Sequence, residues 1–251
     1  MTDRISGSAF KQMITFGAAC VTQQKQAIND LNVFPVPDGD TGTNMSLTIQ
    51  TAVNELKKSE PATVGEAAKI TAGALLRGAR GNSGVILSLL FRGLSKSVKG
   101  LTDMDGAQLA AAMAEGVTTA YGAVMKPAEG TVLTVSRLAA ARAVEAAQEN
   151  PSAEYVLEQA IAAGYETLAQ TIDMNPVLKK AGVVDAGGKG YLIILDGMLR
   201  ALRGEALPQV EEDGEKDQDK ADFGALSLED ITFTYDTVFI VRKRDGVDIG
   251  P

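Results

Sequence analysis

The segment from Leu31 to Met45, LNVFPVPDGDTGTNM, places two aspartates in a loop rich in proline and glycine. Asp38 and Asp40 are separated by one glycine, so a bent loop brings both carboxylates to one point. Hard oxygen ligands of this kind suit Mg²⁺, which completes its coordination with waters and substrate phosphates. Thr41 and Asn44 follow at an expected helix start, where free N–H groups and the helix dipole favour phosphate oxygens. The segment predicts a kinase-like site, with an Asp/Gly turn and helix cap as the alternative.

A second loop, RGARGNSG at residues 77–84, stands directly before the apolar run of residues 85–91. Its glycines let backbone N–H groups surround an anion, and Asn82 and Ser83 add side-chain donors at another expected helix start. The loop is not a Walker A sequence, because neither GxxxxGKS nor GxxxxGKT occurs, and its glycine spacing does not fit the dinucleotide-binding fingerprint. By itself it predicts either an anion-binding loop or an ordinary turn between helices.

Two further glycine-containing loops, KPAEGT at residues 126–131 and VDAGGKG at residues 184–190, also stand before expected helices. In an up-and-down antiparallel bundle, loops that are separated by an even number of helices lie at the same end. We therefore expect several of the four loops to surround one opening. Lys189, in the last loop, is either a phosphate-binding lysine or an ordinary solvated one.

Apolar residues between residues 6 and 204 recur at the three- and four-residue spacing of amphipathic helices, about eight in number. Thr63 with Glu66, and Asp105 before the next apolar stripe, are typical of helix N-terminal caps, and Gly204 of a helix end. Some glycines lie on expected buried faces, where the missing side chain lets helix axes approach closely. These packing glycines are Gly17, Gly116 and Gly164.

The composition of the 251 residues excludes several classes of site. The chain has no histidine and one cysteine, Cys20, so it can form neither a Ser-His-Asp triad, nor a His- or Cys-cluster metal site, nor an intramolecular disulfide. Residues 205–222 hold eight acidic residues and two lysines, which is −6 of the net charge of −8. The rest shows no broad basic face for nucleic acid and no run of 18 apolar residues. We expect a cytoplasmic protein without membrane insertion.

The residue composition changes after residue 204, and this change indicates three parts of the chain. Residues 1–204 form the helical domain. Residues 205–226 form an acidic linker. Residues 227–251 begin a following domain that is mostly absent from the chain, because ITFTYDTVFIVRKR at residues 231–244 has the β-branched and aromatic residues of a strand that cannot bury itself alone.

The four loops in order carry a family resemblance. The motifs LNVFPVPDGDTGTNM, GARGNSGVILS, PAEGTVLTV and GVVDAGGKGY resemble the nucleotide-binding domain of the dihydroxyacetone-kinase superfamily, and more narrowly the N-terminal ATP-binding domain of bacterial fatty acid kinase. The resemblance covers residues 5 to 204, and residues 233–241 resemble the start of that family's next domain. It implies an all-α fold, an eight-helix antiparallel up-and-down barrel that holds ATP or ADP and two Mg²⁺ ions at one end.

The resemblance also implies roles for single residues. Asp38 and Asp40 match the catalytic metal ligands, and Asn32 stands where dihydroxyacetone kinases have a third aspartate ligand. Thr41 stands where those kinases have histidine, so Asn32 and Thr41 both favour the fatty acid kinase branch. The residues that correspond to nucleotide contacts are Thr41, Asn44, Asn82, Ser83, Gly84, Ile86, Gly130, Thr131, Val132, Asp185 and Gly187.

The implied reaction is transfer of the γ-phosphoryl group to a fatty acid held by a DegV-type fatty-acid-binding protein, giving an acyl phosphate. A carboxylate is already ionised at pH 7, so this transfer needs no general base, in agreement with the lack of histidine. We expect nucleotide binding by this chain, weak transfer without further domains, and leave open a homodimer formed through such domains. The alternatives are a dihydroxyacetone kinase nucleotide subunit, a non-catalytic nucleotide-binding module, and a helical bundle without a ligand.

Overall fold

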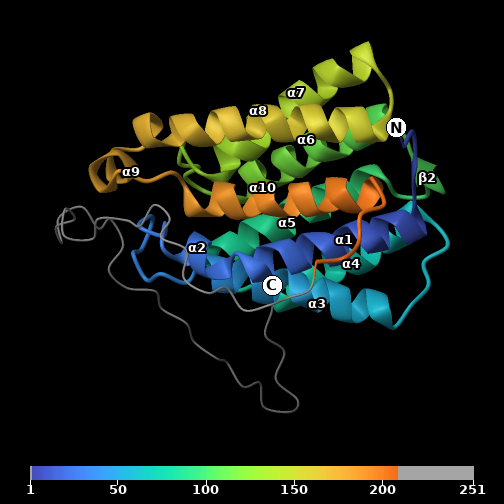
Figure 1. Cartoon of the computed structure of the whole chain (residues 1–251), viewed down its shortest axis with the longest axis horizontal. Helices are drawn as coiled ribbons and strands as arrows, with labels where there is room; N and C mark the ends of the chain where they lie inside the picture. The colour runs from blue at the N-terminus through green and yellow to red at the C-terminus, as the bar shows by residue number, and fades with distance from the viewer. Residues whose placement is uncertain (1, 209–251) are drawn as a thin grey trace, which may run out of the picture.

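Ten helices make up most of residues 2–208, the part of the chain that the computed structural model describes (Figure 1). Eight of them have 15 residues or more, whereas α2 and α9 have five and six. The predicted all-α fold class is confirmed. The expected strand at residues 231–244 and most of the expected linker lie outside the described residues. The helices are α1 (Gly7–Gln23), α2 (Lys25–Asn29), α3 (Thr41–Lys57), α4 (Val64–Gly78), α5 (Gly81–Ser97), α6 (Gly106–Ala123), α7 (Val132–Glu149), α8 (Ala153–Met174), α9 (Pro176–Ala181) and α10 (Ala186–Leu202).

The eight long helices form a closed ring. Each packs against the next in the order α1, α3, α4, α5, α6, α7, α8 and α10, and α10 returns to pack against α1. Successive long helices run in opposite directions, so α3, α5, α7 and α10 all begin at the same end (Figure 1). We call this the loop end; the short helices α2 and α9 also lie there. All four glycine-containing loops therefore lie at one end, where we expected several of them; that they surround an opening stays a prediction.

A small sheet that the sequence did not predict joins the chain near its N-terminus to the α5–α6 connection. Strand β1 (Ile5–Ser6) pairs antiparallel with β2 (Asp103–Met104), and the register places Ile5 opposite Met104. Both of these side chains are completely buried. Two-residue strands are too short to show alternation of apolar and polar residues, which is why the pattern escapes sequence reasoning.

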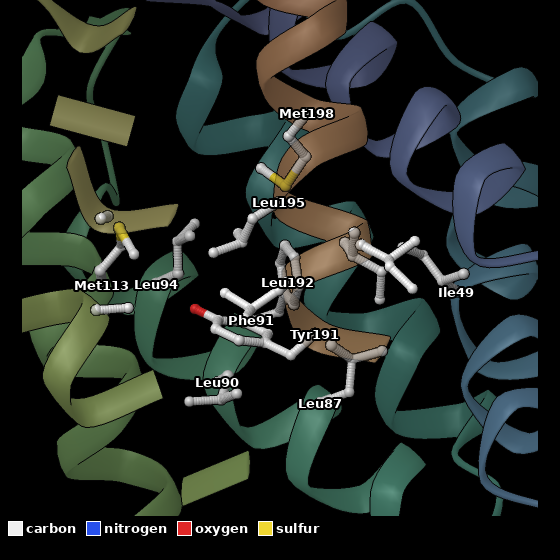
Figure 2. Packing of buried hydrophobic residues seen from close by; sticks show 14 of the residues in the cluster. Ile49, Leu87, Leu90, Phe91, Leu94, Met113, Tyr191, Leu192, Leu195 and Met198 are labelled. Atoms are coloured by element: carbon white, nitrogen blue, oxygen red, sulfur yellow. The ribbon is translucent and has the colours of Figure 1, made fainter. Parts of the chain in front are cut away.

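The core of the ring consists of aliphatic side chains with a few larger residues. Figure 2 shows side chains of α5, such as Phe91 and Leu94, lying in the interior with Tyr191 and Leu195 of α10. Buried Leu, Ile and Met side chains fill most of this interior, because aromatic residues make up only 5% of the chain. Between residues 2 and 208, no helix is long and apolar enough to cross a membrane.

The predicted helix boundaries are confirmed by the hydrogen bonds at the ends. The Thr63 hydroxyl accepts from the Glu66 N–H, and the Glu66 carboxylate accepts from the Thr63 N–H, which is a complete capping box for α4. Asp105 forms the same arrangement with Gln108 at α6. Gly204 has a φ of 75°, a conformation that favours glycine after the end of α10.

Glycines allow the helix backbones to touch at two crossings in the ring. A Cβ atom on Gly197 of α10 would lie 2.7 Å from the Cα atom of Gly17 on α1. A Cβ atom on Gly93 of α5 would lie 2.6 Å from the Cα atom of Gly116 on α6. A Cβ atom on Gly164 of α8 would similarly clash with the Leu192 side chain of α10. The packing role of the three predicted glycines is confirmed, and Gly93 and Gly197 are their unpredicted partners.

Gly197→Ala should lower the free energy of unfolding by about 1–3 kcal/mol, because the added methyl group would force the α1 and α10 backbones apart. Gly122→Ala is the matched control, since a Cβ atom there has nothing within 4 Å. It should raise the free energy of unfolding by up to about 1 kcal/mol through helix propensity. Urea unfolding followed by circular dichroism measures both. Equal effects of the two variants would contradict the assignment of the α1–α10 contact.

Candidate functional site

Each of the four loops identified in the sequence leads into a helix that begins at the loop end. The residues immediately before α3, α5, α7 and α10 are Asp40, Arg80, Thr131 and Asp185. Helix α3 contacts both α5 and α10, and α10 contacts α7. At the centre of the group, a Cβ atom on Gly190 would lie 2.6 Å from the Sδ atom of Met45. The loops thus precede helices that pack against one another, and we group them as an α3–α5 half and an α7–α10 half.

Asn32 organises the loop that carries the two aspartates. Its Oδ1 atom accepts hydrogen bonds from the N–H groups of Asp40 and Thr41, at 3.2 and 3.0 Å, and from the Thr41 hydroxyl, at 2.7 Å. Its Nδ2 atom donates to the carbonyl of Val36, at 2.8 Å. The side chain is almost completely buried, and all of these bonds lie within the loop. Asn32 therefore holds the loop closed, and its role as a metal ligand stays a prediction.

Asn29 performs a similar task one turn upstream, which sequence reasoning missed. Its Oδ1 atom accepts from the Thr43 N–H at 3.1 Å, and its Nδ2 atom donates to the Thr43 hydroxyl at 3.0 Å. Together with Asn32, it uses N–H groups of the first turn of α3 that we expected to be free for phosphate. The two asparagines stand three residues apart, and this spacing predicts that they lie on the same face of a helix. It does not predict which loop that face contacts.

Asp38 and Asp40 lie close enough to influence each other's ionisation. Partial burial and the neighbouring Asp40 carboxylate both raise the pKa of Asp38 above its ordinary value. Asp38 is exposed and Asp40 is half-buried. Neither forms an ion pair with a lysine or arginine of the described residues. Such a pair of carboxylates without a cation is an arrangement that a divalent cation stabilises.

The start of α5 packs directly against α3. Gly81 has a φ of 56°, and a Cβ atom there would lie 2.4 Å from the Nδ2 atom of Asn44. A Cβ atom on Gly84 would lie 2.4 Å from the Oγ1 atom of Thr48, which also accepts from the Arg80 N–H at 3.1 Å. Two requirements for glycine at one helix start fix the backbone of this loop beside α3.

The first turn of α5 differs from that of α3 in its hydrogen bonding. No side-chain cap bond is made by Arg80, the residue before α5. Asn82 is exposed and Ser83 is half-buried, and neither side chain has a hydrogen-bond partner within residues 2–208. N–H groups that lack a cap, together with two small polar side chains, are what an anion needs at a helix start. Of the two starts, α5 fits a phosphate better than α3.

Asp185 joins the starts of α7 and α10. Its carboxylate accepts from the Gly188 N–H, at 2.6 Å, and from the Val132 N–H. Its own N–H donates to the Thr171 hydroxyl, at 3.1 Å. The side chain is 5% exposed, and burial raises the pKa of Asp185 to about 6 despite the two N–H donors. Beside it, Thr131 accepts from the Leu133 N–H as the cap of α7.

The predicted site residues thus fall into the two halves of the loop end. Ile86 and Gly187 are half-buried, and a Cβ atom on Gly187 would lie 3.4 Å from the Val132 Cβ atom. Lys189 does not join either half, because its Nζ atom lies 5.6 Å from the ring centroid of Tyr165 on α8. The α3–α5 half contains Asn32, Asp38, Asp40, Thr41, Asn44, Asn82, Ser83, Gly84 and Ile86, and the α7–α10 half contains Gly130, Thr131, Val132, Asp185 and Gly187.

Comparison with known proteins gives matches over most of the helical region. A family model described as the DAK2 domain matches residues 35–200. Uncharacterized proteins of Staphylococcus haemolyticus and of Staphylococcus aureus strain USA300 are each 43% identical over 246 residues, which cover 96% of this chain. The chain spans 45% of the length of these relatives.

Two solved structures of the dihydroxyacetone kinase of C. freundii share the fold. The native form aligns with a TM-score of 0.58 and 18% identity, and the complex with AMP-PNP and Mg²⁺ aligns with a TM-score of 0.59 and 17% identity. Each alignment covers 80% of this chain and 35% of the other. The helical fold described above therefore also occurs in the dihydroxyacetone kinase of C. freundii.

Asp185→Asn should remove a pH dependence of stability. The pKa of Asp185 is about 6 when folded and near 3.8 in its ordinary state, so between these values the folded chain keeps a proton that the unfolded chain releases. The stability of the unmutated protein should therefore fall, relative to Asp185→Asn, by about 3 kcal/mol as the pH rises through this window. Urea unfolding at several pH values measures this difference. Parallel pH profiles would show that Asp185 titrates normally.

Proposed function

Because the chain belongs to the DAK2 domain family, whose model matches residues 35–200, we propose that it is the Mg²⁺-dependent nucleotide-binding module of a kinase. Two observations carry the proposal: the carboxylates of Asp38 and Asp40 lie together before α3 without a cation from residues 2–208, and the glycine-rich, uncapped start of α5 packs against α3. These are the parts that phosphoryl transfer requires: a place for metal ions and donors that position phosphates. The module comprises residues 2–204.

The donor set at Asp38 and Asp40 fits Mg²⁺, because both ligands are hard carboxylate oxygens and their charges are uncompensated. Within residues 2–208 there is no cluster of three or more His, Cys, Asp or Glu side chains that could hold a metal ion. The remaining ligands are therefore waters and phosphate oxygens. Bound there, Mg²⁺ neutralises charge on the transferring phosphoryl group. We propose two ions at the pair, as the sequence resemblance implies.

The two halves of the loop end take different parts of the nucleotide in this proposal. The backbone N–H groups at the start of α5, with Asn82 and Ser83, hold phosphate oxygens. Asn44 supports this loop from α3. The α7–α10 half, with Thr131 at its edge, faces the adenosine. Asp185 is buried, and its carboxylate accepts from two N–H groups. These bonds hold the starts of α7 and α10 in place.

Asp38→Asn combined with Asp40→Asn should raise the Kd of Mg–AMP-PNP at least about 100-fold, because the substitutions remove both anionic ligands. Asp173→Asn is the control, since that carboxylate is 75% exposed near the same end and its ion pair within residues 2–208 is with Lys179. Calorimetry with Mg²⁺ and with EDTA gives the affinities, and circular dichroism checks the helix content. Affinities in the double variant that match those of the control would exclude the metal site.

The finer proposal is that the phosphoryl acceptor is a fatty acid carboxylate, carried by a DegV-type partner. Asn32 and Thr41 support it, because they form a hydrogen-bonded unit at the positions that distinguish the two branches of the superfamily. The Nδ2 bond from Asn32 to Val36 further requires an amide, since an ionised aspartate has no donor for this carbonyl. With an ionised carboxylate as the acceptor, no histidine is needed for proton removal.

Acyl phosphate formation can be tested with hydroxylamine, which converts an acyl phosphate into a hydroxamate. We expect hydroxamate when ATP, Mg²⁺ and a palmitate-loaded DegV-type protein are combined with the staphylococcal relative of full length, and at most a small amount with the present chain, which spans 45% of that length. Dihydroxyacetone should not be phosphorylated. Product with the triose alone would favour the dihydroxyacetone kinase alternative, and nucleotide binding without any product would favour a non-catalytic module.

A further inference from the structure

The connection between α6 and α7 is held by one carboxylate to which neither the sequence analysis nor the proposed site assigns a role. Glu129 accepts hydrogen bonds from Tyr121 of α6 at 3.1 Å, and from Thr134 and Arg137 of α7, both at 2.7 Å. The Arg137 Nε atom also donates to the Tyr121 hydroxyl, at 3.2 Å. Side chains from the helices before and after the loop therefore meet on a single residue of the loop.

One of these bonds controls the backbone next to the candidate site. An ionised carboxylate only accepts, so the Thr134 hydroxyl must donate its proton to Glu129. The lone pairs of this hydroxyl are then left for the Gly130 N–H, which donates to it at 2.9 Å. Gly130 has a φ of 74° and packs against the end of α8, and Thr131 and Val132 follow it directly. The orientation of one hydroxyl thus fixes the backbone that leads into the α7–α10 half.

The carboxylate contributes little to the stability of the fold. The side chains of Glu129 and Arg137 are 52% and 43% exposed, and exposed ion pairs contribute about 0–1 kcal/mol. The chain contains a close counterpart at the far end of α7, where Glu149 accepts from Arg142 at 2.6 Å and from Tyr155 at 2.7 Å. Glu149 is 48% exposed and is the last residue of α7, at the opposite end of this helix from the loop end. The same three residue types therefore occur with and without a neighbouring site.

We propose that Glu129 is a positioning residue of the nucleotide site: it orients Thr134 so that Gly130 and Thr131 are held in the conformation that receives the nucleotide. This role rests on the proposed function for its ligand, and on the two hydrogen bonds of the Thr134 hydroxyl for the holding of the loop. The effect of Glu129 reaches the site through Thr134 and the Gly130 backbone.

Glu129→Gln and Glu149→Gln test the proposal as a matched pair. The amide at position 129 can offer its NH₂ group to Thr134 and cannot pair with the charge of Arg137. We expect about tenfold faster amide exchange in residues 124–131 and about a tenfold higher Kd for Mg–AMP-PNP in Glu129→Gln. Glu149→Gln should change neither by more than about twofold, and urea unfolding should show similar stability for both variants.

Thr134 provides an independent variant of the same link. Thr134→Val keeps the shape but removes the hydroxyl, so it should reproduce the exchange and affinity changes of Glu129→Gln, whereas Thr134→Ser keeps the hydroxyl and should restore values near those of the unmutated chain. Equal amide exchange in the two glutamine variants would overturn the holding role of Glu129. Faster exchange with an unchanged Kd would overturn its link to the nucleotide.

Failure of the proposed function is distinguishable from failure of this inference. If the unmutated chain binds no Mg–AMP-PNP, the proposed function and the nucleotide part of the inference are both overturned. The exchange measurement on Glu129→Gln and Glu149→Gln uses no nucleotide, so it decides the holding of the loop in either case.

Discussion

Backbone contact between helices is the constraint on which the rest of the structure depends. A ring of eight helices closes only if α10 returns against α1, and Gly17 and Gly197 bring these two backbones together. Closure in turn fixes the direction of each helix, because consecutive long helices are antiparallel (Figure 1). Every second helix therefore begins at the loop end, and four loops that are far apart in sequence lie at that end. The site depends on this packing before any polar residue contributes to it.

At the loop end, neutral and charged side chains have separate tasks. Asn29 and Asn32 satisfy the backbone of the loop and of the first turn of α3, so the conformation is held without a formal charge. Asp38 and Asp40 are consequently left without a cation from the described part of the chain. An uncompensated pair of carboxylates costs free energy when no ligand is bound, and binding of a divalent cation recovers that cost. The residues that hold the loop and the residues proposed to bind a metal ion are thus different residues of the same loop.

Local patterns in the sequence predict most of the fold, whereas contacts that depend on loop conformation cannot be predicted from it. The three- and four-residue spacing identifies the long helices, and Thr63, Asp105 and Gly204 mark helix ends correctly because caps act within one turn. An even number of long helices separates the four loops along the chain, and this predicts that the loops lie at the same end of an antiparallel bundle. The use of α3 N–H groups by Asn29, the position of Lys189 over Tyr165 and the pairing of β1 with β2 each join residues that no local pattern connects. The roles of the candidate site residues remain predictions from resemblance and chemistry.

The single carboxylate that caps two helices makes the loop end mechanically asymmetric. Asp185 bonds to N–H groups at the starts of both α7 and α10, so moving these starts apart would strip a buried carboxylate of one of its donors. The α3 and α5 starts are joined by glycine contacts and by one backbone bond to a threonine hydroxyl, with no shared charge between them. Any widening of the loop end therefore has its lowest cost on the side of Asp38 and Asp40, and the α7–α10 half is the more rigid of the two.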